Sequence, residues 1–279
     1  MPDLINVFAK RWKMILLLTA AAGIIALLFS LLSPKKYLSV ATALPVNVMV
    51  NERSRIFSDN IQVLYSDFGT PDELDKIEGT AALDTIYLAA ASSLQLDKHY
   101  DINAGNESLY NAALILRKNS KISRSGYGEL KIKVWDKDNA MAAMIANTLL
   151  QKIQQLHQRL QNENSKLILE RLKNDYAAKQ QQYLTLSDSA ASFTGAGAEL
   201  WQAKKTAMLQ QVQQYENLID QYQITINSNP QVLLTVESAK PSPWPDKPKL
   251  LPTVLLALFA AFVFAFLLAL FIESRKHKL

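Results

Sequence analysis

The stretch LKIKVWDKDNAMAAMIANTLLQKI, residues 130–153, decides the fold because the spacing of its apolar residues changes partway along it. Its first part alternates apolar residues with lysines, which predicts a half-buried strand. Asp136 and Asp138 then offer a helix N-cap. From Asn139 the apolar spacing is helical, and neither Gly nor Pro interrupts the chain up to Ser187. The sequence therefore predicts a strand that leads directly into one very long helix.

A second helix is predicted after the break SFTGAG at residues 192–197, starting near Ala198. Its apolar residues recur with heptad spacing, which is typical of a coiled-coil seam. We therefore expect residues 139–227 to form a long antiparallel helical hairpin. Apolar positions of the hairpin such as Leu167 and Leu169 are expected to be exposed and to need neighbouring chains. The seam residues are Trp201, Met208, Val212, Tyr215, Ile219 and Tyr222.

Shorter segments outside the hairpin predict a small sheet with helices. Strands are expected at Tyr37–Val48, Ser120–Arg124, Glu129–Trp135 and Gln231–Glu237. Helices are expected from Pro71, at Ala81–Leu94 and at Ser108–Lys118. Residues 51–70 carry no clear pattern. The predicted fold class is α+β, with a base of strands and helices from which the helical hairpin projects.

Two apolar runs, residues 14–32 and 250–272, predict transmembrane helices. Neither contains a charged residue, and each is long enough at helical rise to cross a hydrocarbon core of about 30 Å. The alternative for the first run is a signal peptide cleaved near Ala43. A signal peptide has a shorter apolar region with its cleavage site close behind, so we favour an uncleaved anchor.

Basic residues in the two short tails predict the orientation of these spans. The tail residues are Lys10, Arg11 and Lys13 before the first run and Arg275, Lys276 and Lys278 after the second. Short basic tails stay in the cytoplasm. We therefore expect a two-pass protein of the bacterial inner membrane with both termini cytoplasmic and a periplasmic central domain. Lysines on the other side, namely Lys35, Lys36, Lys247 and Lys249, weaken this bias.

Composition and motifs argue against catalysis. The net charge of +5 is spread along the chain, which gives no case for nucleic-acid binding, and no cysteine is present. No Gly-Lys pair exists, so the phosphate loop G-x-x-x-x-G-K-[ST] is absent. His99, His157 and His277 lie far apart, without metal-ligand spacing. We therefore expect no enzyme activity, catalytic residue, cofactor, metal site or nucleic-acid partner.

The segment AKPSPWPDKPK, residues 239–249, places four prolines directly before the second apolar run. Proline cannot donate a backbone hydrogen bond and biases the preceding residue toward an extended conformation. The motif Pro241, Pro243, Pro245 and Pro248 therefore predicts a stiff, extended strut, with an ordinary linker as the alternative.

Four segments, in this order, resemble the polysaccharide co-polymerase family, the chain-length determinants of Wzz type. They are PDLINVFAKRWKMILL (residues 2–17), KKYLSVATALP (residues 35–45), the stretch at residues 130–153, and the proline-rich segment at residues 239–249. The likeness covers nearly the whole chain. One departure is that residues 250–272 contain no glycine, whereas the family's second span usually carries spaced glycines, which puts the packing of this helix in question.

The resemblance implies a non-catalytic regulator of the chain length of lipopolysaccharide O-antigen or a related polymer. It would assemble as a ring-like homo-oligomer in the lipid bilayer beside a Wzy-type polymerase, with the polysaccharide chain as a further ligand to test. One alternative is an export adaptor for capsule or exopolysaccharide. A second is a periplasmic sensor, which the seven residues after Ile272 disfavour because they leave no room for a signalling domain.

The predicted organisation has eight parts along the chain. They are a cytoplasmic tail (1–13), the first span (14–32), the first part of the base (33–138), the hairpin (139–227), a returning base strand (228–240), the proline-rich segment (241–249), the second span (250–272) and a second cytoplasmic tail (273–279).

Overall fold

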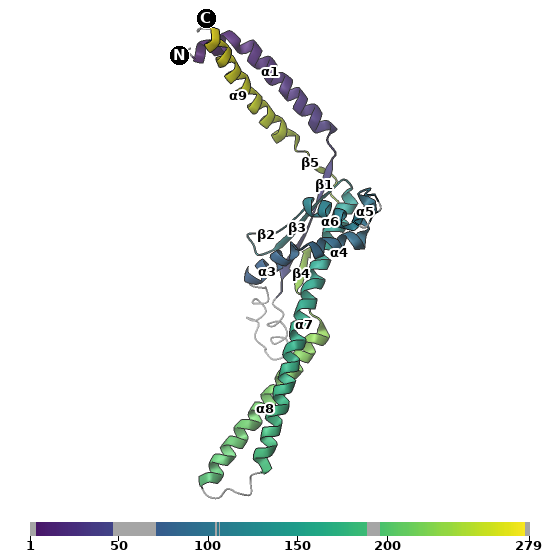
Figure 1. The fold of residues 1–279 in the computed structure, drawn as a ribbon, viewed down its shortest axis with the longest axis vertical. Coiled ribbons are helices and arrows are strands. Elements are labelled where there is room, and N and C mark those ends of the chain that lie inside the picture. Colours follow the sequence, from purple (N-terminus) through teal and green to yellow (C-terminus); the bar gives the residue numbers. More distant parts are fainter. Residues whose placement is uncertain (1–3, 47–70, 104, 106, 189–195, 277–279) are drawn as a thin grey trace. The chain divides into compact units, whose positions relative to one another are not determined.

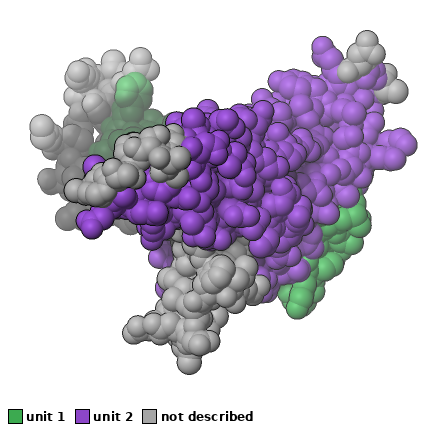
Figure 2. Space-filling view, turned by 90° about the horizontal axis from the view of Figure 1, so that it is seen from below, with its two compact units in different colours: residues 1–40, 133–146, 239–279 green, residues 41–132, 147–238 purple. Residues whose placement is uncertain are grey.

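The computed structural model describes residues 4–46, 71–103, 105, 107–188 and 196–276, and the chain divides into two compact units. Unit 1 comprises residues 1–40, 133–146 and 239–279, and unit 2 comprises residues 41–132 and 147–238 (Figure 2). Long helices combine with one small sheet, so the predicted α+β class is confirmed. The predicted strand end at Val48 and the unassigned residues 51–70 lie outside the described residues.

Helices α1 (Leu4–Leu32) and α9 (Leu250–Lys276) pack against each other within unit 1 (Figure 1). Residues Arg11–Leu32 and Leu250–Ile272 are long and apolar enough to cross a membrane. The second range coincides with the predicted span, whereas the first begins three residues earlier than predicted. Both apolar runs are therefore single helices that continue beyond their uncharged parts.

Small residues let α1 and α9 approach closely. Ile15, Ala265 and Ala269 are buried in the contact between the helices. A Cβ atom built at Gly23 would lie only 2.7 Å from Cδ2 of Leu258. Close helix approach at small residues is the usual packing mode in apolar surroundings. The small residues of this contact are therefore alanines on α9 and Gly23 on α1, although α9 itself contains no glycine.

The sheet contains strands from both ends of the chain. Its strands are β1 (Lys36–Pro45), β2 (Ser120–Arg124), β3 (Leu130–Asp136), β4 (Leu233–Glu237) and β5 (Pro245–Lys247). The order is β2-β3-β1-β4, and β5 also pairs with β1. In unit 2, β1 and β4 are antiparallel, with a register shift between Thr42 and Ala43. The alternation predicted for β3 is confirmed, because Leu130, Ile132 and Val134 are all buried.

Four short helices belong to unit 2: α3 (Pro71–Ala81), α4 (Asp84–Leu94), α5 (Leu96–His99) and α6 (Ser108–Lys118). The helix predicted to start at Ala81 instead starts at Asp84, because α3 ends at Ala81 and Leu83 is the extended N-cap of α4. Helix α5 was not predicted from the sequence. It follows Gln95, which is in the left-handed conformation and turns the chain. Helix α4 packs on α6, and Ile86, Ala90, Ala112 and Leu116 of these two helices are buried.

The long helix α7 spans Asn139–Asp188, and α8 spans Ala196–Ser228. Within unit 2 they run antiparallel (Figure 1), since Asn162 Nδ2 donates to Asn229 Oδ1 at 2.8 Å and Lys205 Nζ lies 5.8 Å from the ring centroid of Tyr183. Leu167 is 60% exposed, as predicted. Leu169 is only 7% exposed, so its predicted exposure was wrong. Two positions along a helix differ by about 200°, which places these leucines on opposite faces.

Candidate functional site

The proline-rich segment is held against β1 within unit 1, and this contact is the candidate functional site. Strand β5 pairs antiparallel with the start of β1, with Lys247 opposite Lys36 and Pro245 opposite Tyr37. Strand β1 begins four residues after the end of α1, and α9 begins three residues after the end of β5. The same two-stranded ribbon therefore continues both apolar helices.

Trp135 holds the ribbon from β3. Its indole Nε1 donates to Oδ2 of Asp246 at 2.7 Å, and Nζ of Lys247 lies 4.2 Å from its ring centroid. The first contact is a hydrogen bond to an ionised acceptor, and the second is a cation–π interaction; each class stabilises by about 0.5–3 kcal/mol. The Trp135 side chain thus contacts two consecutive residues of β5.

Hydrogen bonds to backbone oxygens fix the first half of the segment. The Ser39 hydroxyl donates to the Lys240 carbonyl at 2.9 Å, and Asn139 Nδ2 donates to the Ser242 carbonyl at 3.2 Å. The Ser242 hydroxyl in turn donates to the Trp244 carbonyl at 2.9 Å. We call Trp135, Asp246, Lys247, Ser39 and Asn139 the clasp.

The four prolines of the motif lie in different local settings. Pro245 is the first residue of β5, where a missing amide donor is tolerated. Pro241 and Pro243 are exposed, and Pro248 is half-buried and follows a cis peptide bond from Lys247. The strut stays a prediction, and the structure adds that residues 245–247 of the segment pair with residues 36–37 of β1.

The start of α7 brings the clasp residue Asn139 into place. Oδ1 of Asp138 accepts hydrogen bonds from the amides of Ala140 and Met141, at 2.8 and 3.3 Å. Oδ1 of Asp136 accepts from the amide of Asp138 at 3.0 Å. The predicted cap is therefore confirmed, and it stabilises the turn between Trp135 on β3 and Asn139 on α7.

The predicted seam residues lie in unit 2. Trp201 and Val212 are buried there, and Met208, Tyr215, Ile219 and Tyr222 are half-buried. Nζ of Lys205 lies 5.1 Å from the ring centroid of Trp201. Nothing in these contacts suggests chemistry, and the seam stays a prediction about packing.

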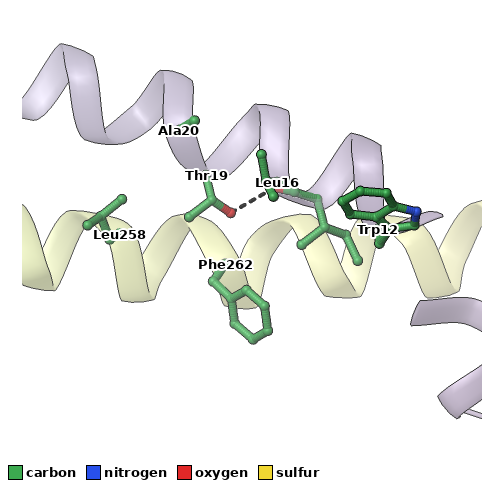
Figure 3. Close-up of a pocket in the computed structure, with 7 residues that line it drawn as sticks. Trp12, Leu16, Thr19, Ala20, Leu258 and Phe262 are labelled. Carbon is green, nitrogen blue, oxygen red and sulfur yellow. Dashed lines mark hydrogen bonds between the residues drawn. The ribbon is translucent and has the colours of Figure 1, made fainter. Parts of the chain in front are cut away.

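A shallow groove lies between α1 and α9 (Figure 3). Its volume is about 530 Å³, and it is lined by Trp12, Ile15, Leu16, Thr19, Ala20, Leu258 and Phe262. The Thr19 hydroxyl donates to the backbone oxygen of Ile15 at 2.7 Å, so its polar atom serves its own helix. The lining is otherwise apolar, which suits hydrocarbon rather than a reacting group.

Titratable groups elsewhere in unit 2 have structural roles. Nε2 of His157 lies 2.6 Å from Oγ1 of Thr80, and burial lowers the pKa of His157. Burial likewise raises the pKa of Tyr87. Among the described residues, no group of three or more His, Cys, Asp or Glu side chains could hold a metal ion.

Sequence reasoning found the proline motif but missed Trp135, Ser39 and Asn139. Trp135 is the one large aromatic residue on the lysine-bearing face of an alternating strand. A large aromatic residue on a polar face indicates that another part of the chain packs against it. Ser39 and Asn139 gave no comparable signal. The Trp135–Asp246 bond joins residues 111 positions apart, beyond the range of any local pattern.

No protein-family model matches the chain, and no curated protein matches it either. Among solved structures, it is similar to a full-length bacterial polysaccharide co-polymerase, with 14% identity and a TM-score of 0.44 over 99% of this chain and 98% of that chain. It is also similar to a fragment of WzzB, a polysaccharide co-polymerase from Salmonella Typhimurium, with 14% identity and a TM-score of 0.35 over 77% of this chain and all of that chain. Both names agree with the family that the sequence resembles.

Proposed function

We propose that this chain is a non-catalytic, membrane-anchored regulator of polysaccharide chain length, acting beside a polymerase of Wzy type. Its polymer would be lipopolysaccharide O-antigen or a related surface polysaccharide. The ordered resemblance of four segments to the co-polymerase family supports the proposal, as do two helices that are apolar enough to span a membrane. In this proposal both termini are cytoplasmic and the segment between the helices is periplasmic.

The clasp is the observation that carries the proposal. A regulator without a reaction of its own must act by geometry, which requires a defined connection between its membrane helices and its sheet. The ribbon of β1 and β5 provides such a connection in unit 1, and Trp135, Ser39 and Asn139 hold it by side-chain contacts. A simple linker would not need contacts at both its ends.

Assembly into a ring-like homo-oligomer is part of this proposal. Several leucines on the helical hairpin are about half exposed or more, namely Leu160, Leu167, Leu184 and Leu200. Neighbouring chains packed along the hairpin would cover these side chains, which is why assembly belongs to the proposal. Light scattering of the purified chain in detergent should give a mass several times 31.2 kDa. A monomer in detergents that preserve other membrane oligomers would contradict this part.

The function is tested by deleting the gene and analysing the lipid-linked polysaccharide on a gel. We expect polymer without a preferred length, and restoration of the preferred length by the wild-type gene. A ladder unchanged by the deletion would remove the chain-length assignment. A normal ladder with less polymer at the cell surface would instead support the export adaptor.

The role of the proline-rich segment that the clasp holds is tested by replacing Pro241, Pro243, Pro245 and Pro248 together with alanine. Each replacement adds backbone freedom worth about 0.4–1 kcal/mol, so the joint should sample more angles. We expect a broadened or shortened ladder at normal protein levels. Pro71→Ala, at the first residue of α3, is the control and should leave the ladder unchanged. An unchanged ladder in the fourfold variant would reduce the segment to a linker.

A further inference from the structure

A polar cleft lies in unit 2 between α7 and β4, the last strand in the order β2-β3-β1-β4. Its volume is about 230 Å³. Two buried leucines give the cleft its apolar part, and the other lining side chains are neutral amides and hydroxyls. The lining residues are Asn147, Leu150, Gln151, Gln154, Gln231, Leu233, Thr235 and Ser238. We call this feature the amide cleft.

The α7 side of the amide cleft belongs to a longer row of amides. Residues spaced by three or four positions share one face of a helix, and the row is Asn147, Gln151, Gln154, Gln158 and Asn162. Gln154 Oε1 accepts from the amide of Leu233 at 2.7 Å, and Gln158 Nε2 donates to the carbonyl of Pro230 at 3.2 Å. With Asn162, these residues hold the chain that returns from α8 to β4.

Gln151 belongs to the same row but has no such structural role. In the part of the chain that the structure describes, the side chains of Gln151, Gln231 and Thr235 make no hydrogen bond, and all three residues are exposed. Each amide offers two donors and an acceptor oxygen, and the hydroxyl offers one donor. Packing therefore accounts for Gln154 and Gln158, whereas Gln151 presents its amide to an open cleft.

The lining indicates the chemistry of a ligand. Leu150 and Leu233 suit an apolar surface, and the amides and hydroxyls around them suit neutral groups that both donate and accept hydrogen bonds. Among the described residues no charged side chain lines the cleft, which disfavours an ionic ligand. A neutral sugar ring combines a C–H face with a rim of hydroxyls. The cleft is smaller than the roughly 300–1,000 Å³ typical of drug-sized ligands, which suits a single sugar unit.

The alternative ligand is an extended polypeptide that adds a strand to β4. Strand addition depends on main-chain hydrogen bonds along the edge of a sheet. The Leu233 amide already donates to Gln154 Oε1, so this donor is not available to a further strand. The cleft therefore favours a sugar over a peptide.

We propose that the amide cleft binds a neutral sugar unit of the polysaccharide whose length this chain regulates. The identity of that polymer rests on the proposed function, whereas the sugar-binding chemistry rests on the cleft. One small, open site should bind a single unit weakly. A repeating polymer that meets the same cleft on several chains of an oligomer would be held more tightly, because the later binding events are intramolecular.

The experiment measures binding by saturation-transfer NMR with the full-length chain in nanodiscs. The probe is the polysaccharide released from the lipid-linked pool of the same cells, and polygalacturonate is the charged comparison. Gln151→Ala combined with Thr235→Val should weaken binding of the released polysaccharide by about fivefold for each group removed. Both side chains are exposed and make no hydrogen bond among the described residues, so the unfolding temperature should stay unchanged. If it falls, the two single variants are titrated separately.

The matched control is Gln182→Ala combined with Thr206→Val, which removes the same groups from exposed positions of the helical hairpin. We expect this control to bind as wild type does. Equal binding by the cleft variant and wild type, equal losses in both double variants, or tighter binding of polygalacturonate would overturn the proposal. Unchanged saccharide binding together with a smaller oligomer in light scattering would assign the cleft to a protein contact instead.

The cleft and the proposed function fail separately. If deletion of the gene leaves the ladder unchanged while the wild-type chain still binds the released polysaccharide through the cleft, the chain-length assignment fails alone. If the deletion removes the preferred length but the cleft variant binds as wild type does, the amide cleft fails alone.

Discussion

The proximal part of α7, residues 139–153, and its distal part, residues 154–188, belong to one uninterrupted helix but bury different surfaces. In the proximal part, seven apolar side chains are buried: Ala142, Ala143, Ile145, Ala146, Leu149, Leu150 and Ile153. In the distal part only Ser165 and Leu169 are buried. The proximal turns are thus a core helix, whereas the distal turns depend on a narrow contact with α8.

The two parts of α7 are therefore stabilised in different ways: the proximal part by core packing, and the distal part by the helix propensity of its residues. Alanines in the proximal part allow close packing, and the larger residues between them fill the core. The distal part is rich in Gln, Lys and Glu, which are good helix formers that need no core. A substitution should therefore cost most in the proximal part and little in the distal part.

The largest effect is expected from Leu149→Ala in the proximal part. Leu149 is fully buried, and removal of a buried leucine side chain costs about 2–5 kcal/mol of unfolding free energy. Within a single chain, Leu160→Ala, at a half-exposed position of the distal part, should cost no more than about 0.5 kcal/mol. Thermal unfolding of the full chain in detergent, followed by circular dichroism, measures both. Equal costs would show that Leu160 is buried by a neighbouring chain.

The sequence predicted the parts of this comparison that depend on local pattern. The uninterrupted helix from Asn139, its Asp138 cap and the alternation in β3 follow from spacing and residue type, and the structure confirms them. The sequence indicated only in part that α7 divides into a buried and an exposed part. Leu167 and Leu169 look alike in sequence, but their different burial depends on which face α8 covers.

The candidate site was predictable only as a motif. Four prolines before an apolar run signal a constrained segment, yet they do not say what the segment touches. Its partners are Trp135, Ser39 and Asn139, each about 100 to 200 residues away in the chain. Contacts of this kind form when the fold closes, so periodicity carries no information about them.

The second prediction compares the clasp with the helical hairpin by one substitution. Trp135→Phe keeps an aromatic ring over Lys247 but removes the hydrogen bond to Asp246. A bond to a charged group contributes about 1.5–3 kcal/mol, so β5 should open more readily by that amount. Amide hydrogen exchange of the peptide covering residues 239–249 measures this local opening.

Trp201→Phe is the matched control because the buried Nε1 of Trp201 has no hydrogen-bond partner among the described residues. Its loss should leave exchange in residues 239–249 unchanged and should cost little stability, since an unsatisfied polar group disappears with it. Equal protection of β5 in wild type and Trp135→Phe would mean that strand pairing alone holds the segment.

The third prediction concerns His157, near the junction between the two parts of α7. The Thr80 hydroxyl donates to the carbonyls of Lys76 and Ile77, so its oxygen accepts from Nε2 of His157. Burial lowers the pKa of His157 below its ordinary value of 6.5. Above pH 6.5 the His157 imidazole is mostly neutral in both the folded and the unfolded chain. As the pH falls through 6.5 the unfolded chain binds the proton first, so folding stability decreases down to the folded pKa.

His157→Gln should remove this part of the pH dependence. We expect the unfolding temperature of wild type to fall more than that of the variant between about pH 7.5 and 5.5. The comparison uses the difference between two pH values for each protein, so a constant cost of the substitution cancels. Parallel curves for wild type and His157→Gln would contradict the assigned burial of the imidazole.

The smallest effects on the unfolding free energy are expected from exposed ion pairs. For such pairs, a substitution beside the sheet and one on distal α7 should cost similar, small amounts. Arg124 Nη1 lies 2.6 Å from Asp75 Oδ1 beside the sheet, and Lys166 Nζ lies 2.9 Å from Glu163 Oε1 on distal α7. All four side chains are more than half exposed, so solvent screens both pairs. Arg124→Gln and Lys166→Gln should each change the unfolding free energy by no more than about 1 kcal/mol, and less at high salt.

An Arg124→Gln variant as costly as Leu149→Ala, beside a neutral Lys166→Gln variant, would contradict this expectation. Charge rather than burial would then explain why substitutions cost more in one region than in the other. Unfolding of both variants at low and high salt decides between these two causes.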